Sequence, residues 1–168
     1  MKTHIYIDAA NIILSARDQG MDFDLVKLIT YLKNKYRADK IIYFTARFQA
    51  HEQLYMDLYK NEVEIVFKQS YKEKNRLKAN CDVEIAHRIT YDIETNKVQA
   101  IILTSGDGDF ASLLDYAKSK LEIVRCFSAH PKNTSMKIKE RDYLEIIYMS
   151  QIIDLLQKRE ILDTDLPV

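Results

Sequence analysis

Cysteine, proline and glycine are scarce in this chain of 168 residues, which holds two, two and three of them respectively. Cys81 and Cys126 are too few and too far apart to make a disulfide framework or a metal-binding pair, so we expect a reducing compartment, the cytoplasm. No apolar run approaches the 18 or more residues of a membrane span, and Asp8 and Asn11 interrupt the run near the start of the chain. These absences exclude a small disulfide-rich protein and a membrane-spanning one.

An excess of charge of either sign is also missing, because 25 basic residues balance 25 acidic ones. A balanced chain does not attract polyanions over its whole surface, so any nucleic-acid binding has to come from local patches. The hydrophobic share of 47% is enough to build a core at this length. The composition therefore indicates an ordered globular protein.

Short apolar runs alternate with stretches of helical spacing along the chain. Each run precedes apolar residues that recur every three or four positions, and the runs cover residues 5–8, 40–45, 63–67, 100–104 and 122–127. This alternation predicts an α/β fold of three layers (α/β/α), with a central, mostly parallel, Rossmann-like sheet of five strands. We expect a single domain over residues 1–157 and a tail over 158–168. Ligands bind such sheets outside the carboxyl ends of the strands.

Four aspartates are predicted to reach that edge of the sheet. Asp8 ends the first run, Asp107 and Asp109 follow the fourth run, and Asp82 opens the helix that precedes it. Each has an ordinary structural explanation as a helix cap, a partner of the helix dipole or a turn residue. Their convergence from three distant parts of the sequence favours a common site.

Carboxylates gathered at one edge are stabilised by a cation, since two like charges about 4 Å apart repel by roughly 4 kcal/mol at an effective dielectric constant near 20. We expect Mg²⁺ or Mn²⁺, because hard divalent cations prefer oxygen ligands. Asp8 is expected to be the central ligand and Asp107 the second, while Asp82 and Asp109 ligate directly or through water. The amide of Asn11 is suited to orient a water or a substrate oxygen.

The motifs around these residues resemble a known family. Ile7-Asp8-Ala9-Ala10-Asn11, Lys78 to Val83, and Thr104-Ser105-Gly106-Asp107-Gly108-Asp109-Phe110 resemble the motifs of NYN domains, the LabA-like branch of the PIN-like nuclease superfamily. The resemblance extends to the end of the fifth apolar run. It implies a PIN-like sheet, an acidic pocket that binds Mg²⁺ or Mn²⁺, and endoribonuclease activity. It also implies that the catalytic set is Asp8, Asn11, Asp82, Asp107 and Asp109.

The sequence departs from the family pattern after Asp82. Family members often carry another aspartate about two turns into that helix, where this chain has Glu84, His87 and Arg88, and Asp92 lies too far along. The departure leaves a one-metal site or a non-catalytic adaptor that binds RNA or protein as alternatives. A haloacid-dehalogenase-like phosphatase is disfavoured, because two alanines follow Asp8 where it needs an acid. A receiver domain is disfavoured because it needs a phosphoacceptor aspartate after the third strand, where this chain has Lys68-Gln69-Ser70.

Two basic stretches are candidates for contact with the backbone phosphates of single-stranded RNA. The first lies between the third run and Asp82, and together with Ser105 it supplies the residues we expect to bind nucleic acid: Lys72, Lys74, Arg76 and Lys78. Tyr71 in this stretch is suited to stack on a base. The second covers residues 132–141, and Asn133-Thr134-Ser135 at its start is suited to cap a helix or hold a phosphate. Charge runs also occur in solvated loops, and that alternative stays open for both.

The last apolar segment, residues 143–156, is spaced like a helix or a helix pair that packs on the sheet. Its apolar face is equally suited to pair two subunits, and the sequence does not decide between these arrangements. The chain shows no signature of a dedicated RNA-reading module, so a partner protein that delivers the substrate is a further expectation.

Overall fold

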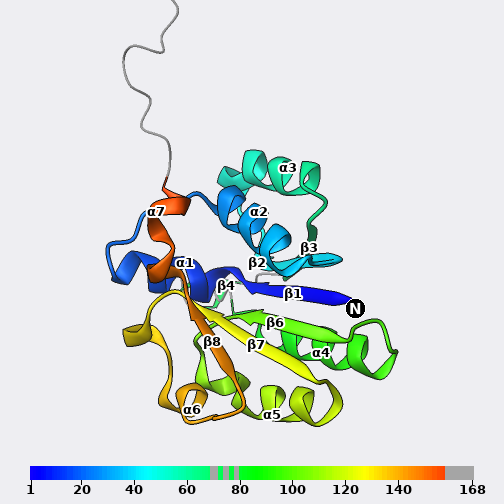
Figure 1. Ribbon diagram of the computed structural model, residues 1–168. Coiled ribbons are helices and arrows are strands. Elements are labelled where there is room, and N and C mark those ends of the chain that lie inside the picture. The colour runs from blue at the N-terminus through cyan, green and yellow to red at the C-terminus, as the bar shows by residue number, and fades with distance from the viewer. Residues whose placement is uncertain (69–71, 74–75, 78–79, 158–168) are drawn as a thin grey trace, which may run out of the picture.

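A parallel sheet of six strands forms the centre of the protein (Figure 1). The computed structural model describes residues 1–68, 72–73, 76–77 and 80–157. The strands follow the order β3-β2-β1-β6-β7-β8 across the sheet. Their bounds are Thr3–Asp8 (β1), Lys40–Ala46 (β2), Glu64–Lys68 (β3), Ala100–Thr104 (β6), Ile123–Ser128 (β7) and Glu145–Tyr148 (β8).

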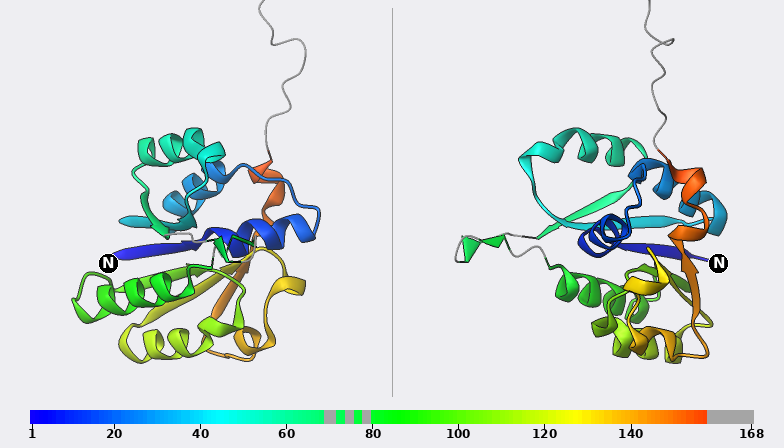
Figure 2. Two further views of the ribbon diagram at one scale, coloured as in Figure 1. Left: turned by 180° about the vertical axis from the view of Figure 1, so that it is seen from behind. Right: turned by 90° about the vertical axis from the view of Figure 1, so that its left-hand side faces the viewer.

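Helices lie on both faces of the sheet, so the predicted three-layer α/β/α architecture is confirmed (Figure 2). One face packs against α1 (Ala9–Asp18), α2 (Leu25–Tyr36), α3 (Glu52–Lys60) and α7 (Ile153–Leu156). The other packs against α4 (Asp82–Glu94), α5 (Ala111–Lys120) and α6 (Met136–Lys139). Short 3₁₀ turns complete the connections: η1 (Gln49–His51), η2 (Gly108–Phe110), η3 (Pro131–Asn133) and η4 (Met149–Gln151).

The central strands are apolar on both sides because helices cover both of their faces. In β1, Ile5 and Ile7 belong to the core under α1 and α2, whereas Tyr6 between them belongs to the core under α4 and α5. Every residue of β1 and β6 is buried. Strands of this kind appear in the sequence as nearly continuous apolar runs, and all five runs correctly predicted strands.

A sixth strand, β8, corrects the prediction of five. The segment 143–156 was predicted to be a helix or helix pair, but its first part is extended and pairs with β7. Ile146 packs against the core of one face and Ile147 against the core of the other. Neighbouring residues that face opposite sides of a sheet have the period of a strand. The spacing that resembled a helix belongs to two short elements joined by the η4 turn.

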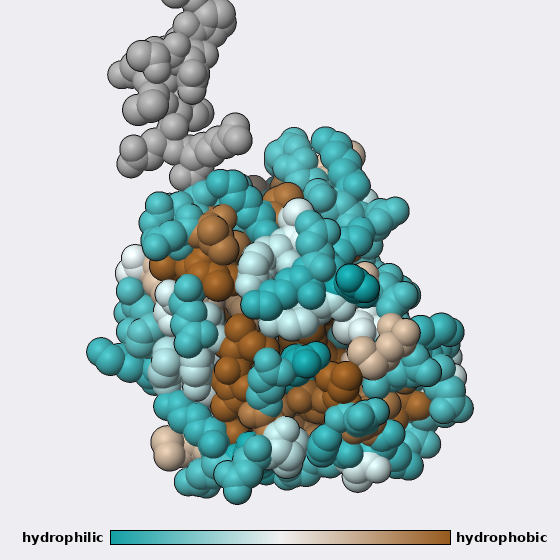
Figure 3. Space-filling model, in the orientation of Figure 1, coloured by the Kyte–Doolittle hydropathy of each residue, from teal (hydrophilic) through white to brown (hydrophobic). Residues whose placement is uncertain are grey.

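Hydrophobic side chains come to the surface on one part of the sheet. In the view of Figure 1 no helix lies in front of β7 and β8, and brown side chains are visible on that part of the face in Figure 3. Ile147 is one of the partly buried residues of this face. The pairing of two subunits through it stays a prediction.

The strand order reverses direction between β1 and β6. From β1 the chain adds β2 and β3 on one side, and it then crosses over to add β6, β7 and β8 on the other. Asp8 ends β1, and Asp107 follows β6, so the switch point of the sheet carries the acidic residues predicted for the site. Within the described part of the chain, no helix has the length and apolar character needed to cross a membrane.

Candidate metal and nucleic-acid site

Asp8 occupies the end of β1 and caps the helix that follows. It is 5% exposed, and its Oδ1 accepts a hydrogen bond from the backbone N–H of Asn11 at 3.1 Å. Its Oδ2 accepts a hydrogen bond from the hydroxyl of Ser105 at 3.0 Å. Burial raises the pKa of the Asp8 carboxyl to about 6, against the lowering effect of these two hydrogen bonds, and the charges of Asp82 and Asp107 add to the rise.

Asn11 fastens the first turn of α1 to the turn after β6. Its Oδ1 accepts a hydrogen bond from the backbone N–H of Gly106 at 2.9 Å. The partner is 95 positions away in the sequence, so only the adjacency of β1 and β6 brings the two together. Asn11 therefore holds Asp8 and the segment that carries Asp107 in a fixed relation.

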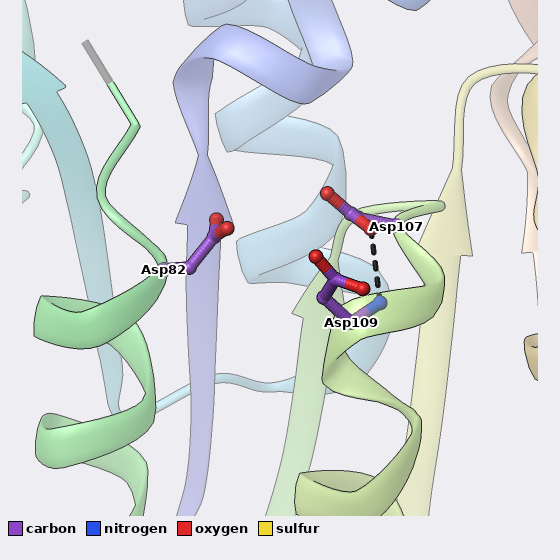
Figure 4. Close-up of side chains that lie close together, drawn as sticks. All are labelled: Asp82, Asp107 and Asp109. Atoms are coloured by element: carbon purple, nitrogen blue, oxygen red, sulfur yellow. Dashed lines mark hydrogen bonds between the residues drawn. The ribbon is translucent and has the colours of Figure 1, made fainter. Parts of the chain in front are cut away.

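Three carboxylates meet at this edge, and we name Asp82, Asp107 and Asp109 the acid group. Each offers one oxygen, and these three atoms all lie within 4.8 Å of one another. Asp82 points from the start of α4 toward the other two, which flank the turn before α5 (Figure 4). Oδ1 of Asp107 accepts a hydrogen bond from the backbone N–H of Asp109 at 2.9 Å, which fixes their relative positions.

The surroundings of Asp82 disfavour its negative charge. Burial raises the pKa of Asp82 most, and the charges of Asp107 and Asp109 raise it further, while a hydrogen bond with Asn80 opposes them. Asp8 is not a member of this group of three, although it lies close enough for Asp82 and Asp107 to raise its pKa. The structure thus brings three of the four predicted acids together and buries the fourth beside them.

Both glycines of the turn after β6 are required for space. A Cβ on Gly106 would lie 2.7 Å from Oγ of Ser128 and 2.8 Å from the backbone oxygen of Asn133, and a Cβ on Gly108 would collide with the side chain of Ser135. Neither glycine has the left-handed backbone that Gly20 has, with its φ of 65°. Glycine at these positions thus allows the loop after β7 to approach the acid turn closely.

That approach creates an open pocket of about 430 Å³ beside the acid group. One wall is the turn with Asp107 and Asp109, and Asn11 also lines the pocket. The other wall is the loop of residues 131–137, in which Lys132 and Lys137 line the pocket. Of the predicted capping stretch Asn133-Thr134-Ser135, Ser135 caps a helix, since its Oγ accepts the backbone N–H of Lys137 at 3.3 Å.

Ser105 does not fit its predicted contact with nucleic acid. Its side chain is completely buried, and its hydroxyl donates to Asp8, so the residue supports a carboxylate rather than facing a substrate. The sequence prediction missed this role because the bond joins residues 97 positions apart. The one signal in the sequence for this role is that Ser105 directly follows a predicted strand, as Asp8 ends another.

The first basic stretch lies partly outside the described residues. Lys74 and Lys78 belong to the part that is not described, whereas Lys72 and Arg76 lie in two short strands, β4 (Lys72–Glu73) and β5 (Arg76–Leu77). These strands pair antiparallel and stand away from the sheet in the right-hand view of Figure 2. Binding of nucleic acid by this stretch stays a prediction.

Helix α4 adds no second acid to the site in the described structure. Glu84 forms an ion pair with Lys68 at 3.4 Å, and Asp92 is 1% exposed and accepts from Nε of Arg88 at 2.9 Å. The hydroxyl of Tyr6 also donates to Asp92, at 3.1 Å. Asp92 therefore belongs to a buried network inside the fold, as its distance along the helix suggested.

Comparisons with known proteins identify both a family and a fold. The model of the family described as NYN domain matches residues 2–149. A solved structure of a protein of unknown function from Vibrio parahaemolyticus is similar with a TM-score of 0.71 and 21% sequence identity, covering 87% of this chain and 92% of that one. The second similarity shows a shared fold. Among curated proteins, none matches the chain.

Proposed function

This chain belongs to the NYN domain family, and from that membership we propose that it is a metal-dependent endoribonuclease that hydrolyses single-stranded RNA. The family carries a PIN-like nuclease fold, and an acid group lies at the switch point of this sheet. The observation that supports the proposal most is the meeting of three carboxylates from two distant segments within 4.8 Å. Such a concentration of charge is costly unless a cation offsets it.

The residues of the acid group fit Mg²⁺ or Mn²⁺ by the chemistry of their donor atoms. All three offer carboxylate oxygens, the ligands that hard divalent cations prefer, and no thiol or imidazole belongs to the group. Asp82, Asp107 and Asp109 would hold the ion, and the nearby Asp8 would contribute its negative charge. A bound ion would polarise the scissile phosphate and lower the pKa of a water molecule.

The chain's own residues preorganise this site. Ser105 and the backbone of Asn11 orient the two oxygens of Asp8. The Asn11 side chain holds Gly106, and the Asp107 carboxylate holds the backbone of Asp109, so hydrogen bonds fix the turn that carries two members of the acid group. Groups held in place before the reaction stabilise developing charge without having to reorganise.

The shape of the site favours a single-stranded substrate. The acid group lies between two turns at the sheet edge and opens into a pocket, so a flexible strand can bring one phosphate to the carboxylates. RNA in the cytoplasm is the substrate class that we propose, and its delivery by a partner protein remains part of the proposal. The basic first stretch would add contacts to backbone phosphates that carry no sequence preference.

The proposal is tested with purified protein and a labelled single-stranded RNA oligonucleotide. We expect cleavage with Mn²⁺ or Mg²⁺ and none with EDTA, and a loss of at least about tenfold in rate in Asp82→Asn and in Asp107→Asn. Asp142→Asn is the matched control, because Asp142 is exposed and lies outside the acid group. Equal cleavage by Asp107→Asn and by the control would refute a role for the acid group.

A second candidate is a non-catalytic RNA-binding adaptor. It is favoured by α4, which supplies only Asp82 among the described residues, while Glu84 and Asp92 are engaged with Lys68 and Arg88. This candidate predicts RNA binding without cleavage under any divalent cation. It also predicts that Asp107→Asn binds RNA at least as tightly as the natural chain, since the variant removes a negative charge from the site.

A further inference from the structure

The loop of residues 131–137 is built onto the acid turn. The backbone N–H of Ser135 donates to the backbone oxygen of Gly106 at 2.9 Å. Cδ of Lys137 lies 3.2 Å from the point where a Cβ on Gly108 would be, so the aliphatic stem of this lysine runs against the turn. Two of the three glycines in the chain thus serve the contact between this loop and the acid turn.

Two lysines of the loop have no acidic partner among the described residues. Lys132 and Lys137 are exposed, and neither forms an ion pair with any residue that the structure describes. Arg141, which follows the same loop, contrasts with them because its guanidinium pairs with Asp115 at 2.6 Å. The charges of Lys132 and Lys137 are therefore available to an anion from outside.

The lysines and the acid group share a pocket through two residues. Asp107 and Asp109 belong to the acid group and also line the pocket whose opposite wall carries Lys132 and Lys137. The pocket volume of about 430 Å³ is within the range of sites that bind small molecules or parts of larger ones. A strand with one phosphate at the acid group would therefore continue toward the lysines.

We propose that Lys132 and Lys137 form a subsite for the backbone phosphate next to the scissile one, so that the site binds two consecutive phosphates of RNA. The inference rests on the proposed function and assigns the second phosphate to this wall. Lysine binds phosphate as a point charge without regard to sequence. It also offsets the repulsion that a polyanion meets on approaching three carboxylates. The subsite favours an internal phosphodiester over a mononucleotide.

The test measures binding of a labelled single-stranded RNA oligonucleotide in EDTA over a range of salt concentrations. We expect K132Q/K137Q to bind at least tenfold more weakly at low salt, and its plot of log affinity against log salt to be less steep by about 0.7, the value for one phosphate contact. The matched control is K2Q/K97Q, which removes the same charge from exposed lysines just before β1 and β6, at the opposite edge of the sheet.

Two further measurements make the outcome decisive. K132R/K137R keeps the charge and is expected to restore most of the affinity, and thermal unfolding shows whether each variant is folded. Equal affinity and slope in K132Q/K137Q and K2Q/K97Q would overturn the subsite. Binding in EDTA is measured independently of cleavage. If the natural chain cleaves RNA but the salt slope of K132Q/K137Q equals that of the natural chain, only the subsite is refuted. If the natural chain does not cleave RNA but the salt slope of K132Q/K137Q is reduced, only the proposed nuclease activity is refuted.

Discussion

The hydroxyl of Ser105 donates a hydrogen bond to Oδ2 of Asp8 at 3.0 Å, from the strand end next to the one that Asp8 terminates. Both side chains are buried, so this bond is one of the few that stabilise the carboxylate in its ionised form. The bond therefore connects the stability of the fold to the charge of the site.

Replacing Ser105 with alanine is expected to destabilise the protein by about 1 to 3 kcal/mol when Asp8 is ionised. The loss is larger at pH 8 than at pH 5, because the Asp8 pKa of about 6 leaves the carboxyl mostly protonated at the lower pH. Urea denaturation in EDTA measures both values. Ser128→Ala is the control, since Ser128 and Thr134 form a buried bond between neutral groups at 2.7 Å. A Ser105→Ala cost that is the same at both pH values would contradict the prediction.

Asp8→Asn is expected to gain stability relative to the natural chain as the pH rises. The folded state raises the pKa of Asp8 from 3.8 to about 6, mainly through burial, so the folded form binds the proton more tightly than the unfolded form. The contribution of the natural carboxyl to stability is thus present below pH 4 and lost between pH 4 and pH 6. Asparagine does not titrate, so the difference between the two proteins should change by up to about 3 kcal/mol over this range.

The measurement for Asp8→Asn is a series of urea unfolding curves between pH 4 and pH 8 in EDTA. Asp18→Asn serves as the control, because Asp18 is exposed at the end of α1. A difference between Asp8→Asn and the natural chain that stays constant with pH would show that burial does not disfavour the Asp8 charge.

Gly106→Ala is expected to cost about 1 to 3 kcal/mol of stability, because its Cβ would lie 2.8 Å from a backbone oxygen of the 131–137 loop. The backbone on one side and the buried Ser128 on the other leave little room for adjustment. Gly20→Asn is the control: nothing lies within 4 Å of its added Cβ, and asparagine tolerates the positive φ. Equal midpoints of urea unfolding for the two variants would show that the loop yields without cost.

Arg88→Met is expected to destabilise the protein by about 3 kcal/mol at pH 7, because it leaves the charge of Asp92 buried without its cation. The double variant Arg88→Met with Asp92→Asn should recover part of that loss, since the unpaired charge is gone. Arg17→Met at an exposed position of α1 is the control. Urea denaturation of the variants decides the matter, and an Arg88→Met cost no larger than that of Arg17→Met would contradict the prediction.

The sequence pattern of the segment 143–156 predicted a helix where the structure has a strand, β8. Leu144, Ile147 and Tyr148 have helical spacing, whereas in the structure Ile147 and Tyr148 lie in β8 and Leu144 lies just before it. Short apolar segments are ambiguous in this way, because the period is sampled over too few residues. Pairing with β7 makes this segment a strand, and a local sequence pattern does not show which strand a segment pairs with.

The sequence alone determined five strands, the helices between them and the edge of the sheet that carries the acids. These features follow from local periodicity, and parallel strands necessarily gather their carboxyl ends at one edge. The motifs around Asp8 and Asp107 also indicated the family.

Only the tertiary structure decided which groups meet. It brought Asp82, Asp107 and Asp109 together, buried Asp8 under the hydroxyl of Ser105, and placed the lysine loop against the two glycines. Each of these contacts joins residues that the order of strands or the packing of a helix on the sheet makes neighbours. Distances between such residues depend on how whole layers pack. Side chains are close-packed to within a few tenths of an ångström, and spacing along the sequence does not determine distances this finely.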